Sequence, residues 1–338
     1  MSIKLLDNNF CAYFYKMKKI LLSFLLSISF SFSNANELFK LVLSENQKLE
    51  NTYSVSLSNN ATFHLATIKN SKSKKHELIS YYITSEKQVK QLEKLVLEDI
   101  PNIISYHKSG EEITFITYNI KDKDLAIIDF NIVSGKHKIK TIQNQKKTDH
   151  IFRLDDKTIM VYSNKKLLEV IEINNSQSQS EKRIKLSGEN EKKFQKFLLQ
   201  KPQEINQNEY VKNGSIEDAR VYLTNDENIV FTKVAKNNSI DLMVFNMTSE
   251  SINASEINFD EPDIKYKDFN TYLQNDNLFA ILNNNDNIVL KNYNLADKTH
   301  KETLSIKENL AQIKTKSEYF EEFLKEARKS KMKPTITF

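Results

Sequence analysis

The chain has 338 residues and a formal net charge of +5, with 49 Lys and Arg residues against 44 Asp and Glu. Because both charge signs are mixed along the chain, the composition excludes the concentrated basic footprint of a nucleic-acid-binding protein. Hydrophobic residues make up 39% and aromatic residues 10% of the sequence, which indicates a folded protein and excludes a disordered one.

Residues 17–35 read MKKILLSFLLSISFSFSNA and have the layout of a secretory signal peptide. Lys18 and Lys19 form the positive region, an apolar and serine-rich run follows, and Ala35 is the small residue at the expected cleavage point. The run is shorter than the about 20 apolar residues of a transmembrane helix. We therefore predict an exported protein, periplasmic or secreted, with no membrane span after cleavage. An uncleaved membrane anchor is the alternative.

The first sixteen residues fit no part of a signal peptide, which predicts that translation starts at Met17. The single cysteine, Cys11, lies in this leader and does not follow a lipidation pattern. Cleavage after Ala35 would leave a mature chain without cysteine, and therefore without disulfides or thiol chemistry. Residues 1–35 are thus assigned to a leader and signal peptide.

From residue 106 onward the chain repeats an apolar run, a short polar turn and further apolar runs. The aligned turns are residues 109–110, 155–156, 225–226 and 275–276, which read SG, DD, ND and ND. Successive turns are about 46, 70 and 50 residues apart, and an inserted stretch at 188–213 accounts for the longest interval. The underlying period of about 45 residues is typical of four-stranded propeller blades.

The runs within each repeat predict strands. NIVFTKVA and DLMVFNM are apolar on both faces, which predicts sheets packed between neighbouring sheets. KHKIKTI, EKRIKLS, ASEINF and KETLSI alternate polar and apolar residues, which predicts charged outer edge strands. A more divergent first unit is predicted from residue 51, and its segment VKQLEKLVLED, residues 89–99, fits either a strand or a helix.

Two segments have helical periodicity. NEKKFQKFLLQKP places three apolar residues on one face and stops at Pro202. TKSEYFEEFLKEARKSK opens with Thr315 and Glu318 at capping-box spacing and has an apolar stripe over residues 320–327. This second helix either packs on the propeller or docks a partner. The final KPTITF is expected to add an edge strand.

The stretch LTNDENIVFTKVAKNNSIDLMVFNMTSE resembles the repeat of TolB-type β-propellers, with a turn, an apolar strand, a polar hairpin and a second strand. The resemblance covers about residues 106–306, although SG, DD or ND stands where the family has Pro-Asp-Gly. It implies an all-β ring of five to seven four-stranded blades, with six favoured. The predicted domains are a propeller at 36–308, with a helical insertion near 188–213, and a C-terminal helix and tail at 309–338.

The sequence carries no local catalytic or metal-binding motif. Only four glycines occur, so GxGxxG and GxxxxGK are absent, and Asn is expected to replace Gly at turn positions with positive φ. There is no GxSxG and no histidine pair at helical spacing. His107 and His150 each begin a repeat and could form a two-histidine site, but ordinary strand histidines are favoured. Residues 282–287, LNNNDN, lack the Gly and Glu of a calcium loop and are explained by turn formation.

These observations predict no catalytic residues, no cofactor and no metal site, and they assign no binding residues. The predicted function is an exported, non-enzymatic β-propeller that binds a protein or another envelope component. The alternative is a propeller-type hydrolase or lyase whose scattered titratable residues converge at the central channel. A third reading is a structural subunit whose propeller is completed by a partner chain.

Overall fold

The computed structural model describes residues 40–57, 60–119, 123–143, 146–206, 217–235, 238–259, 264, 266–284, 286–306 and 319–329. The chain divides into two compact units, Met1–Ile100 and Pro101–Phe338. The predicted propeller region at 36–308 is therefore shared between both units. The signal peptide at 17–35, Cys11, the capping residues Thr315 and Glu318 and the final KPTITF lie outside the described residues.

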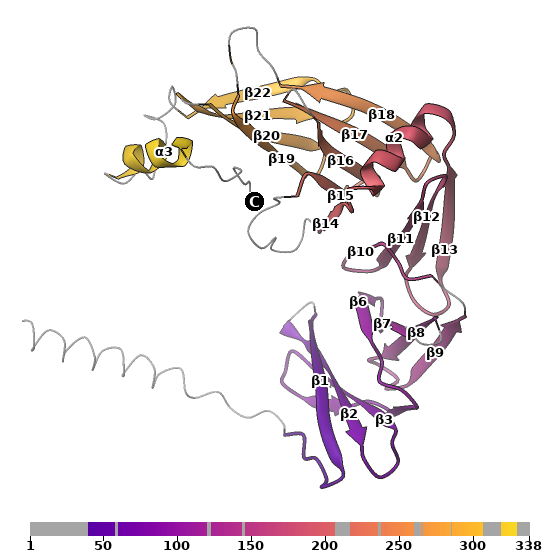
Figure 1. Ribbon diagram of the computed structural model, residues 1–338. Helices are drawn as coiled ribbons and strands as arrows, with labels where there is room; N and C mark the ends of the chain where they lie inside the picture. The colour runs from indigo at the N-terminus through magenta and orange to yellow at the C-terminus, as the bar shows by residue number, and fades with distance from the viewer. Residues whose placement is uncertain are drawn as a thin grey trace, which may run out of the picture. The chain divides into compact units, whose positions relative to one another are not determined.

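The first unit holds one antiparallel sheet whose strands follow chain order (Figure 1). Its strands are β1 (Gln47–Ser56), β2 (Thr62–Asn70), β3 (His76–Ile83), β4 (Val89–Gln91) and β5 (Leu95–Leu97). Both β4 and β5 pair with β3, one at each end, so they form a single interrupted fourth strand. Segment 89–99 is therefore a strand and not a helix. Leu92 and Leu95 point into the core at 4% and 6% exposure, which fixes the segment against β3.

The second unit holds four sheets, each built from consecutive antiparallel strands. The first sheet contains β6 (Ile103–Ser109), β7 (Glu112–Asn119), β8 (Asp124–Asn131) and β9 (His137–Ile142). The second contains β10 (His150–Arg153), β11 (Thr158–Asn164), β12 (Leu167–Ile173) and β13 (Gln179–Lys185). The third contains β14 (Gln203–Ile205), β15 (Ala219–Leu223), β16 (Ile229–Ala235), β17 (Ser239–Asn246) and β18 (Ser251–Asn258). The fourth contains β19 (Asp268–Gln274), β20 (Asn277–Asn283), β21 (Ile288–Asn294) and β22 (His300–Ser305). The short β14 pairs with β15 in parallel and is an addition to the four-strand pattern.

Three hydrophobic clusters join these four sheets in sequence order. One lies between β7–β8 and β11–β12, the next between β10–β13 and β15–β17, and the third between β15–β18 and β19–β21. Successive side chains of a strand point to opposite faces of its sheet, so one strand contributes to two clusters. On β16, Val230 belongs to the third cluster and its neighbour Phe231 belongs to the second. The prediction of sheets apolar on both faces is confirmed. The predicted outer strands β9, β13, β18 and β22 form sheet edges and are mostly exposed.

Both predicted helices are present. The first, α2 (Gly188–Leu198), follows the second sheet and packs on β16 and β18 (Figure 1). Its Phe194 is fully buried, with ring centroids 5.0 Å from Phe231 and 5.2 Å from Phe245. The helix ends before Pro202, as the sequence predicts. The second helix, α3 (Phe320–Lys329), lies near the C-terminus.

The all-β, propeller-type architecture predicted from the repeat is therefore confirmed. The described residues form five sheets with the blade pattern, which is the lower end of the predicted range of five to seven. The six blades favoured by the sequence exceed the sheets that the described residues contain.

Because the chain has few glycines, other residues occupy many of the turn positions with positive φ. Among the described residues, positive φ occurs at three Asn residues, Asn60, Asn238 and Asn275, as predicted, but also at five Lys residues: Lys74, Lys87, Lys123, Lys201 and Lys298. The left-handed conformation costs a residue with a Cβ about 1 kcal/mol. Lysine is tolerated because its Cβ is unbranched and its charged end stays in water at these surface turns. Asparagine is therefore not the main substitute for glycine here.

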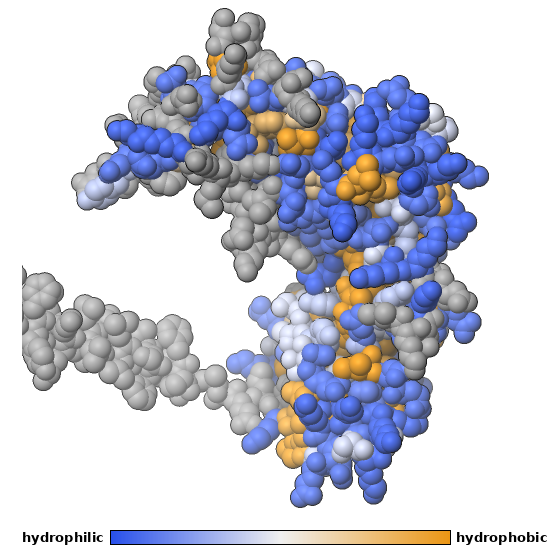
Figure 2. Space-filling view, viewed as in Figure 1, coloured by the Kyte–Doolittle hydropathy of each residue, from blue (hydrophilic) through white to orange (hydrophobic). Residues whose placement is uncertain are grey.

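On the face that Figure 2 shows, hydrophilic residues predominate and apolar residues lie in separate patches. Scattered exposed apolar side chains are normal on a folded protein and do not mark a site by themselves. Among the helices of the described part of the chain, none has the length and apolar character needed to cross a membrane.

Candidate functional site

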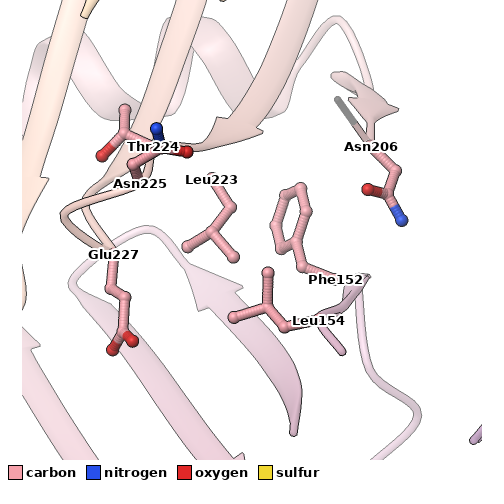
Figure 3. A pocket seen from close by; sticks show the side chains of 7 residues that line it. All are labelled: Phe152, Leu154, Asn206, Leu223, Thr224, Asn225 and Glu227. Carbon is pink, nitrogen blue, oxygen red and sulfur yellow. The ribbon is translucent and has the colours of Figure 1, made fainter. Parts of the chain in front are cut away.

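A pocket of about 230 Å³ lies between the second and third sheets of the second unit (Figure 3). It is formed where β10 ends on one side and where β14 and β15 end on the other. Seven residues of the described part of the chain line it: Phe152, Leu154, Asn206, Leu223, Thr224, Asn225 and Glu227. Pockets for drug-sized ligands have volumes of about 300 Å³ or more. This pocket is smaller, so it suits a ligand smaller than a typical drug.

The pocket has an apolar floor and a polar rim. Figure 3 shows the side chains of Phe152, Leu154 and Leu223 converging, with Glu227 and Asn206 on opposite sides. Phe152 and Leu223 are part of the hydrophobic cluster that joins the two sheets, so the floor is rigid. An apolar surface with a few oriented polar groups is the usual design of a small-molecule site.

The turn between β15 and β16 presents Glu227 to the pocket. Three hydrogen bonds close this turn: Glu227 N donates to Thr224 O at 2.9 Å, Thr224 N to Asn228 O at 3.0 Å, and Asn228 N to Thr224 Oγ1 at 3.1 Å. They hold Glu227 at a φ of +59°, in the left-handed region. The same three-bond turn recurs at residues 84–88, where Lys87 has a φ of +63°, so this conformation belongs to the turn and does not by itself mark a site.

An ion pair between the two sheets fixes the carboxylate of Glu227. Lys157, in the turn between β10 and β11, donates from Nζ to Glu227 Oε1 and lies 3.4 Å from Glu172 Oε1. Burial lowers the pKa of Lys157, but its hydrogen bonds and charge interactions with Glu227 and Glu172 outweigh burial and raise it. Lys157 therefore stays protonated at neutral pH and orients the carboxylate at the pocket rim.

Near the first and second sheets, a buried hydrogen-bond chain contains His107. Its Nε2 lies 2.7 Å from Asn174 O, and its Nδ1 lies 2.9 Å from Thr158 Oγ1. A carbonyl oxygen only accepts, so Nε2 carries the proton and Nδ1 of the neutral ring accepts from Thr158. Thr158 Oγ1 can then accept from Ser105 Oγ at 2.8 Å. The chain runs in one direction, from Ser105 through Thr158 to His107.

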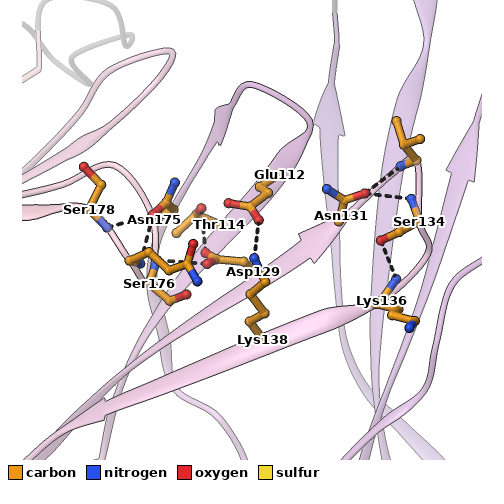
Figure 4. A network of polar contacts seen from close by, with 12 residues as sticks. Glu112, Thr114, Asp129, Asn131, Ser134, Lys136, Lys138, Asn175, Ser176 and Ser178 are labelled. Atoms are coloured by element: carbon orange, nitrogen blue, oxygen red, sulfur yellow. Dashed lines mark hydrogen bonds and ion pairs between the residues drawn. The ribbon is translucent and has the colours of Figure 1, made fainter.

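A buried carboxylate, Asp129 on β8, makes a second link between these sheets (Figure 4). It accepts from Thr114 Oγ1 at 2.9 Å and from Ser176 N, in the turn after β12, at 2.8 Å. Asp129 and Thr114 are 1% and 0% exposed. Because these groups are satisfied and shielded from solvent, we assign this network and the His107 chain to holding sheets together.

The two histidines named in the sequence analysis, His107 and His150, lie in different environments. His107 belongs to the buried chain above, and His150 packs against the ring of Phe231 at a centroid distance of 6.1 Å. No group of three or more His, Cys, Asp or Glu side chains in the described ranges could hold a metal ion. In segment 282–287, Asn284 Oδ1 accepts from the backbone N atoms of Asp286 at 2.9 Å and Asn287 at 2.6 Å, as expected for turn formation.

We expect the free energy of unfolding to fall as the pH drops below about 6.5, the ordinary pKa of histidine. Burial lowers the pKa of His107 and of His150, so below that pH the unfolded chain binds more protons than the folded chain. Stability therefore rises with pH through this window and is lost as the pH approaches the folded pKa values. Urea unfolding of the wild type and of His107→Gln at several pH values from 5 to 7.5 measures this effect. Because Gln does not titrate, the free energy of unfolding of His107→Gln should depend less steeply on pH than that of the wild type. An equal pH dependence in the two proteins would refute the role of His107.

Comparison with known proteins gives matches only among solved structures. No family model and no curated protein matches the chain. A variant of the Synechocystis apocarotenoid oxygenase (ACO) is 11% identical, with a TM-score of 0.35, and the match covers 78% of this chain and 63% of that chain. Cobalt-substituted Synechocystis ACO is 10% identical at a TM-score of 0.35, covering 80% and 64%. An ACO/RPE65 chimera is 12% identical at a TM-score of 0.33, covering 78% and 63%. The chain thus spans less than two thirds of the length of these structures.

The similar structures are those of oxygenases, which contradicts the sequence-based prediction of a non-enzymatic interaction module. That prediction treated the absence of a local catalytic motif as evidence against an enzyme. Repeated sheets can bring together side chains that are far apart in the sequence, so the inference was unsafe. No family model tests the TolB-type resemblance, which stays a prediction.

Sequence reasoning missed all seven pocket residues. The aligned repeat turns at 155–156 and 225–226 did contain a signal, because equivalent turns of neighbouring blades fall at the same edge. Glu227 directly follows one of these turns, and Lys157 directly follows the other. An opposite-charge pair at equivalent positions of two consecutive repeats could have pointed to this edge.

Proposed function

We propose that the chain is a propeller-type enzyme, a hydrolase or lyase, that acts on a small, partly apolar substrate in the pocket between β10–β13 and β14–β18. One observation carries the proposal: Glu227 lines the rim of an apolar pocket, and its carboxylate is oriented by the half-buried Lys157. The proposal keeps the reaction class of the alternative reading of the sequence, a propeller-type hydrolase or lyase, but it places the site between two sheets and not at the central channel.

Glu227 would act as the general base. Its Oε1 is held by Lys157, which leaves Oε2 to take a proton from an attacking water in hydrolysis or from carbon in an elimination. Phe152 and Leu223 would exclude water from one side of the substrate. Asn225 and Asn206 offer amide groups that can fix its orientation. Lys157 is a positioning residue, because it acts through Glu227.

We expect Glu227→Gln to lower turnover about 100-fold or more, since a positioned general base contributes about 10² to 10⁴ in rate. The measurement screens the purified protein with chromogenic esters, glycosides and elimination substrates, then compares variants on the best substrate. Glu172→Gln is the matched control, because it removes the other carboxylate partner of Lys157 without altering the pocket lining. Equal losses in both variants, or a full rate in Glu227→Gln, would show that Glu227 is not the base.

We also propose that the protein is exported by the segment at 17–35. Lys18, Lys19 and the apolar run support this assignment. Cell fractionation with N-terminal sequencing of the native protein tests it. A mature N-terminus just after Ala35 is expected, and a cytoplasmic protein that keeps residues 17–35 would disprove export.

A further inference from the structure

We propose that the ligand of the pocket is a small organic ammonium ion, an apolar body carrying one protonated amine. The inference rests on the proposed function for its site and adds the chemical class of the molecule bound there. It follows from the charge of the lining, the charge of the surrounding turns and the state of Glu227.

Among the described residues that line the pocket, one side chain is ionisable, and it is an acid. Six of the seven lining residues are apolar or neutral, and the seventh is Glu227. Lys157, the cation that contacts Glu227, is engaged by Glu227 and Glu172 and is not among the described lining residues. An anionic ligand would therefore meet a carboxylate with no compensating positive charge among the described lining residues, which disfavours carboxylates and phosphates.

The two turns that border the pocket add further negative charge around it. Residues 154–157 read LDDK and residues 224–228 read TNDEN, so together they carry four carboxylates and one lysine, a net charge of −3. An acidic rim above an apolar floor attracts a cation and strengthens its interaction when it is partly desolvated.

The geometry of Glu227 indicates which end of the ligand it receives. Lys157 occupies Oε1 of the carboxylate, and Oε2 can accept a hydrogen bond from a donor in the pocket. An ammonium group supplies both the donor and the positive charge, whereas an alcohol supplies only the donor. The convergent side chains of Phe152, Leu154 and Leu223 would receive a branched or compact apolar body (Figure 3).

Three probes with one apolar body test this assignment: 3-methylbutylamine, 3-methyl-1-butanol and 3-methylbutanoate. Their dissociation constants are measured by NMR titration at pH 7, at low salt and at 0.3 M NaCl. We expect the amine to bind at least about tenfold more tightly than the alcohol, a factor that corresponds to about 1.4 kcal/mol, and the carboxylate most weakly. The advantage of the amine should shrink at high salt.

Variants locate the effect. Glu227→Gln should abolish the preference for the amine, whereas Asp226→Asn, on the same turn but outside the lining, should keep most of it. Asn225→Trp, at an exposed rim position, should weaken all three probes by filling the pocket. Equal binding of amine and alcohol, or a preference for the amine that survives both Glu227→Gln and Asn225→Trp, would overturn the inference.

Binding and turnover separate this inference from the proposed function. If the amine binds in a Glu227-dependent way but no amine substrate is turned over, the result supports the ligand class and contradicts the enzyme proposal. Glu227-dependent turnover of uncharged substrates, with no preference for the amine, would overturn the ligand class and leave the enzyme proposal standing.

Discussion

Arg220→Ala is expected to lower the free energy of unfolding by about 3 to 5 kcal/mol, since a hydrogen bond that involves a charged group contributes about 1.5 to 3 kcal/mol and this change removes two of them. Arg220 lies on β15 and is 1% exposed. Its guanidinium donates from Nη1 to Thr271 O and from Nη2 to Asn270 Oδ1, both on β19 of the next sheet. Truncation removes these charge-assisted bonds, leaves buried acceptors without this donor and creates a cavity, and each of these effects destabilises the fold.

Two further variants separate the causes of this loss. Arg220→Met fills most of the volume and so avoids the cavity, but it leaves the same acceptors on β19 without this donor. We therefore expect a smaller loss than for Arg220→Ala, about 1 to 3 kcal/mol. The double variant with Asn270→Ala should show a coupling of about 0.5 to 3 kcal/mol, because the two side chains are in contact. Urea unfolding is measured for the wild type, Arg220→Ala, Arg220→Met, Asn270→Ala and the double variant of Arg220→Ala with Asn270→Ala. Additive effects and an unchanged midpoint for Arg220→Ala would contradict the assigned link between the sheets.

Phe194→Ala is expected to cost about 3 to 5 kcal/mol, the usual range for removing a fully buried phenylalanine. The ring of Phe194 lies edge-on to Phe231 and Phe245 and closes the cluster between the second and third sheets. Aromatic pairs of this geometry add about 0.5 to 1.5 kcal/mol each beyond buried area. Because α2 covers this cluster, its detachment should expose the apolar edge and lower the thermal midpoint sharply.

Leu199→Ala is the matched control, since it truncates an apolar residue next to the same helix that is 82% exposed. We expect a change within about 0.5 kcal/mol, the usual range for surface substitutions. Thermal unfolding followed by circular dichroism compares both variants with the wild type. Similar losses in the two would show that helix propensity, and not packing of Phe194, accounts for the effect.

The sequence determined the strands and their grouping. A period of about 45 residues, apolar runs with turn residues between them and charged final strands predict four-stranded sheets whose inner strands are buried on both faces, as β15–β17 are. These features are local: an alternation of side chains on one strand assigns each residue to a face wherever that strand packs. The helix at 188–198 was predictable for the same reason, because its apolar spacing and the following Pro202 are neighbours in the chain.

Segment 89–99 marks the limit of local signals. Its apolar spacing fits a helix as well as a strand, and pairing with β3 decided for two short strands. Hydrogen bonds to a neighbouring strand outweigh a weak intrinsic preference, so the tertiary context selects the structure.

Only the tertiary structure decided which side chains meet between sheets. Lys157 and Glu227 are 70 residues apart and Arg220 and Asn270 are 50 apart, yet each pair makes a direct hydrogen bond. Such contacts depend on strand register and on how one sheet seats on the next, which many packing contacts determine together. The pocket beside Glu227 has the same origin: its residues come from three separate stretches of chain, and no one stretch carries its pattern.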